Sequence, residues 1–332
     1  MDFLAVGDIV TEPFIKLKDA EVHCDLNHET CTISMRFGDK IPYESAEVVP
    51  AVGNASNAAV AAARLGVQSA LVTDAGNDEV GKGNIARLQE EGVGIEYVHV
   101  HEGMKSNYHY VLWYQDDRTI LVKHEEYPYH LPADLPAPRW LYLSSLADHS
   151  LPYHEEIEAY LAAHPETKLA FQPGTFQMKL GVEKLKKLYE RSAIFFCNKE
   201  EAERILNLPV DSKISDLLSA LRALGPETVV ITDGTNGAYA YDGTAMLKVP
   251  MYPDQKSPYE RTGAGDAFAS TVTVALSLGE PLEKALLWGP INSMCVVQAI
   301  GAQKGLLSRE ALLKYLVDAP TSYHTEALRL ES

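Results

Sequence analysis

The chain has 332 residues, enough for one large domain or two of ordinary size. Its net charge of −17 argues against sequence-independent binding to nucleic acid, and no run of about 18 apolar residues indicates a membrane span. The first residues lack a basic segment, so they predict a strand rather than a signal peptide. The scattered cysteines, Cys24, Cys31, Cys197 and Cys295, favour reduced thiols and a cytoplasmic location.

Short apolar strands alternate with helices along most of the chain. Strands are predicted at residues 3–7, 69–73, 140–145, 168–172, 193–198 and 228–234. Helices are predicted at residues 58–65, 80–92, 154–164, 182–192 and 213–225, and after Phe268. This alternation indicates an α/β fold with a mostly parallel sheet that is covered by helices on both faces.

Two stretches, 13–50 and 104–125, interrupt this alternation. Both contain β-branched and aromatic residues joined by polar turns, and Asp116-Asp117 forms the second turn. We expect them to form a small antiparallel β lid inserted into the α/β body; the alternative is that they are edge strands of the main sheet. The body would then consist of residues 1–12, 51–103 and 126–332.

A cluster of potential zinc ligands falls in the first of these stretches. It contains His23, Cys24, His28 and Cys31. Structural zinc sites usually pair their ligands and place a second pair at some distance, whereas these ligands alternate in type around a polar turn. The spacing favours a hairpin turn over a zinc site.

The segment from Thr262 to Phe268 reads Thr-Gly-Ala-Gly-Asp-Ala-Phe and runs directly into a long apolar helix. Gly263, Ala264 and Gly265 would expose backbone N–H groups at the helix N-terminus, where an anion binds readily. A carboxylate at this point, Asp266, is explained if it accepts a proton while the amides stabilise a transferring phosphoryl group. The alternative is that Asp266 only caps the helix.

Several motifs, taken together and in this order, resemble those of one known family. They lie at residues 52–57 (followed by an alanine-rich helix), 198–201, 232–237, 262–268 and 301–302. The chain is similar over nearly its whole length to the ribokinase-like carbohydrate kinases of the PfkB (phosphofructokinase B) family. The resemblance implies a three-layer α/β/α sandwich with a β lid.

The resemblance also implies ATP and Mg²⁺ as cofactors and Asp266 as the catalytic base. The residues that would border the nucleotide and its phosphates are Asn198, Glu201, Thr232, Gly234, Gly237, Asn292, Gly301 and Ala302. Glu201 would hold Mg²⁺ through water, at the C-terminal end of a strand, where α/β proteins place ligands. Asn198 and Glu201 also have the spacing of a helix capping box, and the two roles are compatible.

The acceptor implied by the resemblance is a hydroxyl, expected to be primary, of a sugar or sugar derivative. Its contacts would be Glu12, Gly53, Asn54 and Asn57. One alternative is a nucleoside kinase that phosphorylates the 5′-hydroxyl, with lid aromatics stacked on the base; the other use for these aromatics is packing within the lid. A further alternative is a catalytically idle protein that binds sugar or nucleotide, which the intact Asp266 disfavours.

The chain departs from the family pattern at two places. Val52 replaces the first glycine of a Gly-Gly pair, and Glu260-Arg261 replaces an Asp-Thr pair. In related kinases that aspartate helps to hold a monovalent cation, so Glu260 leaves a K⁺ requirement open. Arg261 adds a positive charge beside the phosphate site or lies on the surface. An isolated β lid would leave an apolar face uncovered, so a homodimer through the lid is expected.

Overall fold

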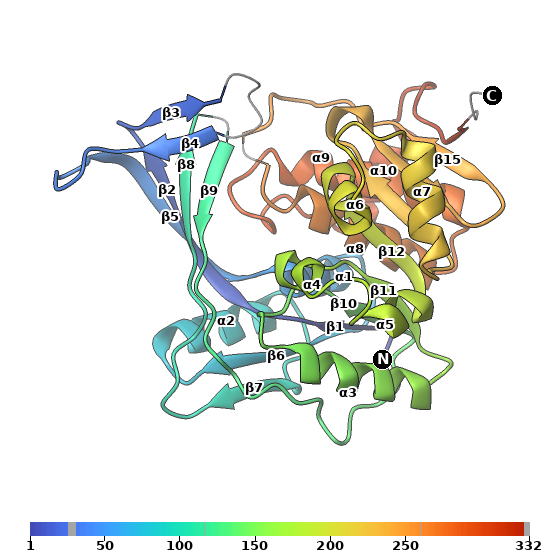
Figure 1. The fold of residues 1–332 in the computed structure, drawn as a ribbon, viewed down its shortest axis with the longest axis horizontal. Helices are drawn as coiled ribbons and strands as arrows, with labels where there is room; N and C mark the ends of the chain where they lie inside the picture. The colour runs from blue at the N-terminus through green and yellow to red at the C-terminus, as the bar shows by residue number, and fades with distance from the viewer. Residues whose placement is uncertain (26–30, 116, 260, 329–332) are drawn as a thin grey trace.

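The computed structural model describes residues 1–25, 31–115, 117–259 and 261–328. Within these ranges, ten strands form one central sheet (Figure 1). In spatial order these strands are β16 (Glu326–Ala327), β15 (Met246–Val249), β14 (Ala238–Tyr241), β13 (Val229–Thr232), β12 (Ser192–Asn198), β11 (Lys168–Phe171), β10 (Trp140–Leu143), β1 (Phe3–Val6), β6 (Ser69–Gly76) and β7 (Val98–His101). The strands from β13 to β7 are parallel, and β14, β15 and β16 extend the sheet in antiparallel fashion.

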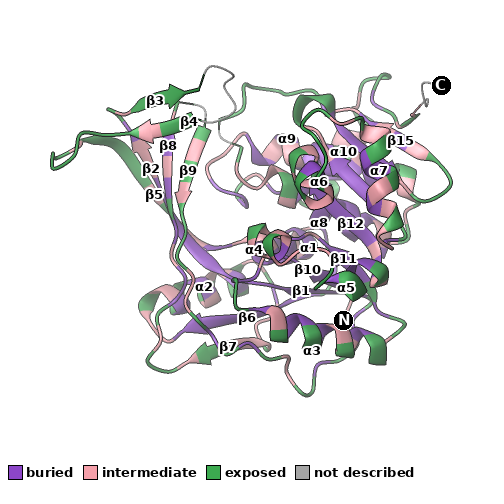
Figure 2. Ribbon diagram, in the orientation of Figure 1, coloured by how far each residue is buried: buried purple, intermediate pink, exposed green. Residues whose placement is uncertain are grey.

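The central strands are buried on both faces because helices cover both sides of the sheet (Figure 2). In β1, Phe3 and Ala5 face one hydrophobic core, whereas Leu4 and Val6 face the other. The first core is covered by α1 (Asn54–Arg64), α2 (Glu79–Glu90), α8 (Ala264–Ser277), α9 (Leu282–Val296) and α10 (Arg309–Val317). The second is covered by α3 (Leu151–Ala163), α4 (Thr175–Leu180), α5 (Lys186–Arg191), α6 (Lys199–Leu206) and α7 (Ile214–Ala223). The fold is the expected α/β/α sandwich.

The two irregular stretches form a separate sheet rather than edges of the main one. Its strand order is β5 (Tyr43–Val52), β2 (Val10–Leu17), β8 (Tyr110–Tyr114) and β9 (Asp117–Leu121). The β2–β5 and β8–β9 pairs are antiparallel, as expected of hairpins, but β2 and β8 are parallel where the two pairs meet. We call this four-stranded sheet the lid; it projects from the body next to α2 (Figure 1).

The tip of the lid corrects the expectation that all four cysteines are reduced. Strands β3 (Glu21–Cys24) and β4 (Cys31–Ser34) form a short antiparallel ribbon, and a disulfide joins Cys24 to Cys31. Cys197 and Cys295 are free thiols. His28 of the possible zinc cluster lies outside the described residues, as does Asp116 of the predicted turn. Among the residues that are described, no cluster of His, Cys, Asp or Glu could hold a metal, and none of the helices could cross a membrane.

Candidate active site

Asp266 lies in the first turn of α8 and is held by two side-chain amides from distant elements. Its Oδ2 accepts a hydrogen bond from Asn57 Nδ2 at 2.8 Å, and its Oδ1 accepts one from Gln172 Nε2 at 3.2 Å. Asn57 belongs to α1, and Gln172 follows the C-terminal end of β11. Burial raises the pKa of Asp266, while the two amide donors lower it. The carboxylate is therefore oriented by amides, rather than used to cap its own helix.

The N-terminus of α8 is open because its capping residue is a glycine. Gly263 has φ 79°, in the left-handed region, and within the described chain no side chain caps this helix end. A Cβ on Gly263 would overlap Ala302, so a side chain is excluded by both conformation and space. The unpaired N–H groups and positive end of the helix dipole at Ala264 and Gly265 form an anion-binding site beside Asp266.

A cavity of about 330 Å³ opens beside this helix terminus. Among the expected nucleotide contacts, Thr232, Gly234, Gly237, Ala264 and Gly265 line it. Its apolar wall is formed by residues from α8, α9 and the segment between β15 and α8, including Met251, Phe268, Pro290, Met294 and Val297. Arg261 supplies a positive charge to the same cavity. A largely apolar pocket that ends at an anion site suits a nucleoside with a phosphate tail.

Asn198 and Glu201 form the capping box of α6. Asn198 Oδ1 accepts from the Glu201 N–H, and Glu201 Oε2 accepts from the Asn198 N–H, both at 2.8 Å. Burial raises the pKa of Glu201, and the negative charge of Asp266 contributes in the same direction. The capping interpretation is confirmed, and the second carboxylate close to Asp266 fits a site for a hydrated divalent cation.

Five of the expected nucleotide residues are not among the described residues that line the cavity: Asn198, Glu201, Asn292, Gly301 and Ala302. Asn292 is fully buried: its Nδ2 donates to Thr271 Oγ1 at 2.8 Å, and its Oδ1 accepts from the Leu307 N–H at 2.9 Å. Both ends of its amide are used to join α8, α9 and the following loop, and Asn292 is not among the described residues that line the cavity. Ala302 packs against Gly263, and Gly301 packs against Val49 of the lid. Glu260, the possible monovalent-cation ligand, lies outside the described residues.

The expected acceptor contacts lie on β2 and at the start of α1. Glu12 is buried on β2, and its Oε1 lies 3.7 Å from Nδ1 of His109. Gly53 has φ 112°, and a Cβ there would lie 2.5 Å from the carbonyl oxygen of Asp8. Asn54 is the first residue of α1, one turn before Asn57. Of these four residues, Asn57 contacts Asp266 directly, and none of the four lines the nucleotide cavity.

Asp8, two residues after the end of β1, makes further polar contacts. Its Oδ1 accepts from the Tyr129 hydroxyl at 2.8 Å, and its Oδ2 lies 3.0 Å from Nδ1 of His124. His124 in turn packs against the rings of His109 and Phe176. The position of Asp8 just after β1 is the one signal that could have marked it, because ligands collect at the carboxyl ends of parallel strands.

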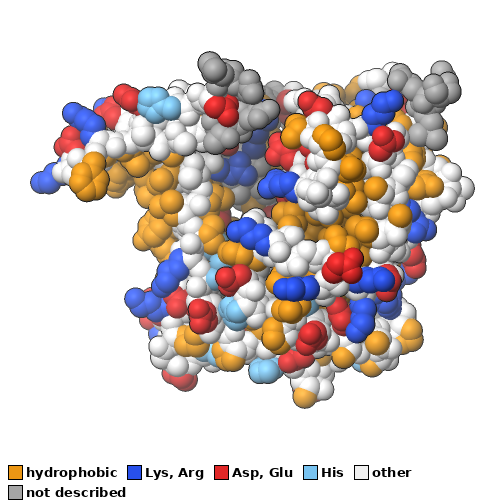
Figure 3. Space-filling model, viewed as in Figure 1, with side chains coloured by type: hydrophobic (Ala, Val, Ile, Leu, Met, Phe, Trp, Pro, Cys, Tyr) orange, Lys and Arg blue, Asp and Glu red, His pale blue; other side chains and the backbone are white. Residues whose placement is uncertain are grey.

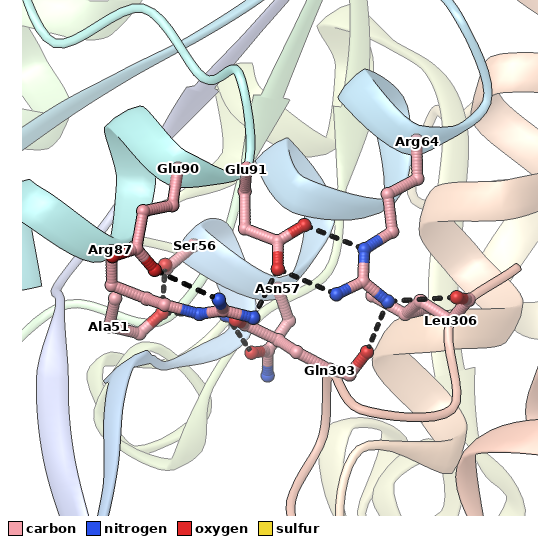
Figure 4. A network of polar contacts seen from close by, with 9 residues as sticks. All are labelled: Ala51, Ser56, Asn57, Arg64, Arg87, Glu90, Glu91, Gln303 and Leu306. Carbon is pink, nitrogen blue, oxygen red and sulfur yellow. Dashed lines mark hydrogen bonds and ion pairs between the residues drawn. The ribbon is translucent and has the colours of Figure 1, made fainter. Parts of the chain in front are cut away.

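A polar network behind α1 orients Asn57 (Figure 4). Gln303 Nε2 donates to Asn57 Oδ1 at 3.1 Å and to the carbonyl oxygen of Ala51 at 2.6 Å. The loop that carries Gln303 is itself held by Arg64, whose Nη1 donates to the carbonyl oxygens of Gln303 and Leu306 at 2.8 Å each. Arg64 also pairs with both carboxylate oxygens of Glu91. No sequence motif marked Gln172 or Gln303.

The aromatic residues of the lid serve mainly for packing. Trp113 is buried and contacts Tyr259 edge to face at 5.0 Å, and Lys16 lies over its ring. Tyr108 packs against Tyr110, which is exposed. The contact between Trp113 and Tyr259, together with an ion pair between Lys304 and Glu47 at 3.6 Å, joins the inner face of the lid to the body.

An oriented carboxylate at an open helix N-terminus, between a nucleotide-sized cavity and a lid, defines a phosphoryl-transferring enzyme with an α/β sandwich fold. Residues 19–309 match the pfkB family carbohydrate kinase domain, and the chain belongs to this family. Its members are phosphotransferases that act on sugar hydroxyl groups.

Individual relatives cover most of the chain. The ribokinase of Bacillus subtilis is 28% identical over 286 residues, 85% of this chain and 92% of that protein. A nucleoside kinase of Methanocaldococcus jannaschii is 26% identical over 80% of this chain and 84% of that protein. The fructoselysine 6-kinase of Escherichia coli is 27% identical over 75% and 90%, respectively. The structure of Arabidopsis thaliana ribokinase complexed with ribose and ATP has a TM-score of 0.78 at 19% identity, covers 95% and 98% of the two chains, and shows the common fold.

Proposed function

We propose that this protein transfers the γ-phosphoryl group of ATP to a primary hydroxyl of a sugar or sugar derivative. The observation that carries the proposal is Asp266, a buried carboxylate that two side-chain amides orient in the first turn of α8, the helix whose N-terminal residues line the cavity. The ribokinase and fructoselysine kinase relatives support a sugar as the acceptor.

The residues have separable roles in this reaction. Bound Mg²⁺–ATP supplies the phosphoryl group and the cation that offsets its charge, and Glu201 would hold that cation through water. The N–H groups at Ala264 and Gly265 bind the phosphate oxygens. Asp266 accepts the proton of the acceptor hydroxyl as its oxygen bonds to phosphorus and the bond to ADP breaks. Asn57 and Gln172 keep the carboxylate aimed at that hydroxyl.

A nucleoside acceptor is the second candidate, supported by the nucleoside kinase of M. jannaschii. The contacts of Trp113 weigh against it, because this ring already packs on Tyr259 and Lys16. A base would have to displace one of them to stack there.

The proposal is tested by ADP release with ribose, fructose, fructose phosphates, 2-keto-3-deoxy sugars and nucleosides as acceptors, and with Asp266→Asn as the background control. Turnover of a sugar by the natural protein, and not by the variant, is the expected result. Binding of sugar without turnover of any acceptor would instead favour an idle binding protein. A dependence of the rate on K⁺ would show that the enzyme still requires a monovalent cation although Glu260-Arg261 replaces the Asp-Thr pair.

Because the reaction uses ATP, we expect it to take place in a compartment that supplies ATP, such as the cytoplasm.

We also propose that two copies meet through the outer face of the lid. Strand register places Val48, Pro13, Tyr110 and Leu121 in one row across this face. Val48 is 58% exposed, Tyr110 45% and Leu121 52%. Pro13 is buried between them. Three exposed apolar side chains over a thin sheet are the kind of surface that a second copy covers.

A further inference from the structure

Arg118 lies on the inner face of the lid, in a row with two other side chains. Strand register places Arg118 of β9 opposite Trp113 of β8, which lies beside Lys16 of β2. Trp113 contacts Tyr259 of the body, so this row faces the body rather than solvent. Glu12 occupies the same face, because it lies four residues before Lys16 on the same strand. Figure 3 shows a hollow between the lid and the body, in which Lys and Arg side chains gather.

The guanidinium of Arg118 has unused hydrogen-bonding capacity. Its Nε is buried and has no hydrogen-bond partner among the residues that the structure describes. Its ion pair with Asp117 is loose, at 3.8 Å, and the Asp117 side chain is 87% exposed. Lys16, in the same row, is by contrast paired with Glu44 at 2.9 Å. Burying an N–H group of a cation without a partner is unfavourable, so this position suits a residue that receives its partner from a ligand.

Arg118 shares the inner face of the lid with Glu12, one of the expected acceptor contacts. Burial raises the pKa of Asp266, and the positive charge of Arg118 acts in the opposite direction. The donor side already has a cation of its own, because Arg261 lines the nucleotide cavity, whereas Arg118 is not among the described residues that line it. We therefore expect the group that hydrogen-bonds to Arg118 to belong to the acceptor substrate rather than to the nucleotide.

We propose that Arg118 binds an oxyanion, a phosphate or a carboxylate, that the acceptor carries away from its reacting hydroxyl. The proposal rests on the kinase function above and narrows its substrate class to anionic sugars. A guanidinium presents parallel N–H donors that match the two oxygens of either group, which a single ammonium does not. Arg118 would thus select acceptors by charge, while Glu12 and Asp266 contact hydroxyls.

The test compares matched acceptors in the natural protein and in Arg118→Gln. Fructose is set against fructose 6-phosphate, and 2-keto-3-deoxygluconate against its methyl ester, which separates the two possible sources of the anion. The natural protein should prefer the anionic member of at least one pair. Arg118→Gln should lower kcat/KM for that anionic acceptor by about ten- to a hundredfold, the usual loss for a charge-assisted hydrogen bond, and leave the neutral acceptor and the KM for ATP unchanged.

Lys16→Met is the matched control, because it removes a cation from the same row that already has a partner; it should leave the preference intact. A raised KM for ATP, or an equal loss with neutral and anionic acceptors, would overturn the proposal and assign Arg118 to the donor. An unchanged preference in Arg118→Gln would overturn it as well.

A binding measurement, which needs no turnover, distinguishes failure of the proposed kinase function from failure of the proposal for Arg118. Calorimetric titration with fructose 6-phosphate, with fructose as its neutral control, measures the anion contact even if no acceptor is phosphorylated. Binding that requires the phosphate and is lost in Arg118→Gln supports the proposal. Equal binding by the natural protein and Arg118→Gln, or binding by neither, refutes it for phosphate, and the same titration with 2-keto-3-deoxygluconate decides it for carboxylate.

Discussion

Asn57 Nδ2 lies 2.8 Å from Asp266 Oδ2, although 209 residues separate the two in the chain. Asn57 lies in the first turn of the helix that follows the lid, and Asp266 lies in the first turn of the helix that borders the nucleotide cavity. This hydrogen bond therefore joins the acceptor side of the site to the donor side. The orientation of the base depends on an amide that Gln303 holds from behind.

Asp266→Asn should fold normally and lose at least ~100-fold in kcat, because the amide cannot accept the proton. Since burial raises the pKa of Asp266 in the folded state, the wild-type carboxylate lowers stability progressively as pH rises from its unfolded pKa through its folded pKa. The variant should thus melt no lower than the natural protein at pH 7. Calorimetry and steady-state kinetics measure the two effects, and turnover near the natural rate would refute the assignment of the base.

Asn57→Ala should shift the pH dependence of the reaction as well as its rate. Asn57 lowers the pKa of Asp266, so its removal should raise that pKa further and move the acid limb of the kcat/KM profile to higher pH. We also expect a loss of about ten- to a hundredfold in kcat from misplacement of the base. Asn292→Ala, which removes a buried amide outside the site, is the control; it should lower stability and leave the acid limb in place.

Glu12→Gln should raise the KM of the acceptor by about ten- to a hundredfold, because hydrogen bonds to a charged group contribute roughly 1.5–3 kcal/mol. The KM for ATP should hardly change, since Glu12 lies on the lid side of Asp266. Initial rates with both substrates varied give the two constants. An unaltered acceptor KM would place Glu12 outside the acceptor pocket.

Gly263→Ala and Gly265→Ala test two different requirements for glycine. The first tests the backbone conformation at the start of α8, and the second tests the space that a bound nucleotide needs. Gly263 has φ 79° and no room for a Cβ, so alanine there should cost about 1–3 kcal/mol of stability and disturb the start of α8. A Cβ on Gly265 would meet only Gln172 Nε2, at 4.0 Å, so this variant should fold normally. It should nevertheless bind ATP more weakly. Gly265 lines the cavity, so the added methyl group would take up space beside the bound nucleotide. Thermal melts and nucleotide titrations distinguish these outcomes.

Leu121→Glu should leave a folded monomer if two lids pack together. Leu121 is exposed in the apolar row of the outer face, so a charge there disrupts an interface without disturbing the core. Light scattering at micromolar concentrations should show a dimer for the natural protein and a monomer for the variant. A monomer in both cases would contradict the proposed assembly, and Val317→Glu, at an exposed apolar site on α10, is the control.

Local sequence patterns predicted the buried strands of the main sheet well. The expected strands 168–172 and 193–198 correspond to β11 and β12, because their apolar runs match burial on both faces of a parallel sheet. The expected helix at 182–192 was less accurate: α5 begins only at Lys186, and Ser192 already opens β12. The helical pattern of apolar residues continues into residues 182–185, which precede α5. Tertiary contacts, rather than this pattern, determine where the helix begins and ends.

Long-range relationships were beyond the reach of these patterns. Gln172 and Gln303 have no motif of their own, and their importance depends on which side chains the fold brings to them. The same reason explains the parallel pairing of β2 with β8, since a hairpin pattern specifies its own two strands and not the neighbour beside them. The buried hydrogen bonds of Asn292 to Thr271 and Leu307 are likewise visible only once the fold is known.

The hydrogen bonds that orient Asp266 also have a consequence for synthesis of the protein on the ribosome. The side chains that orient it come from residues 57 and 172, and the one that orients Asn57 comes from residue 303. A chain emerging from the ribosome therefore lacks an oriented base until almost its entire length is available to fold. Truncated products should be inert towards ATP, so incomplete copies would not consume it.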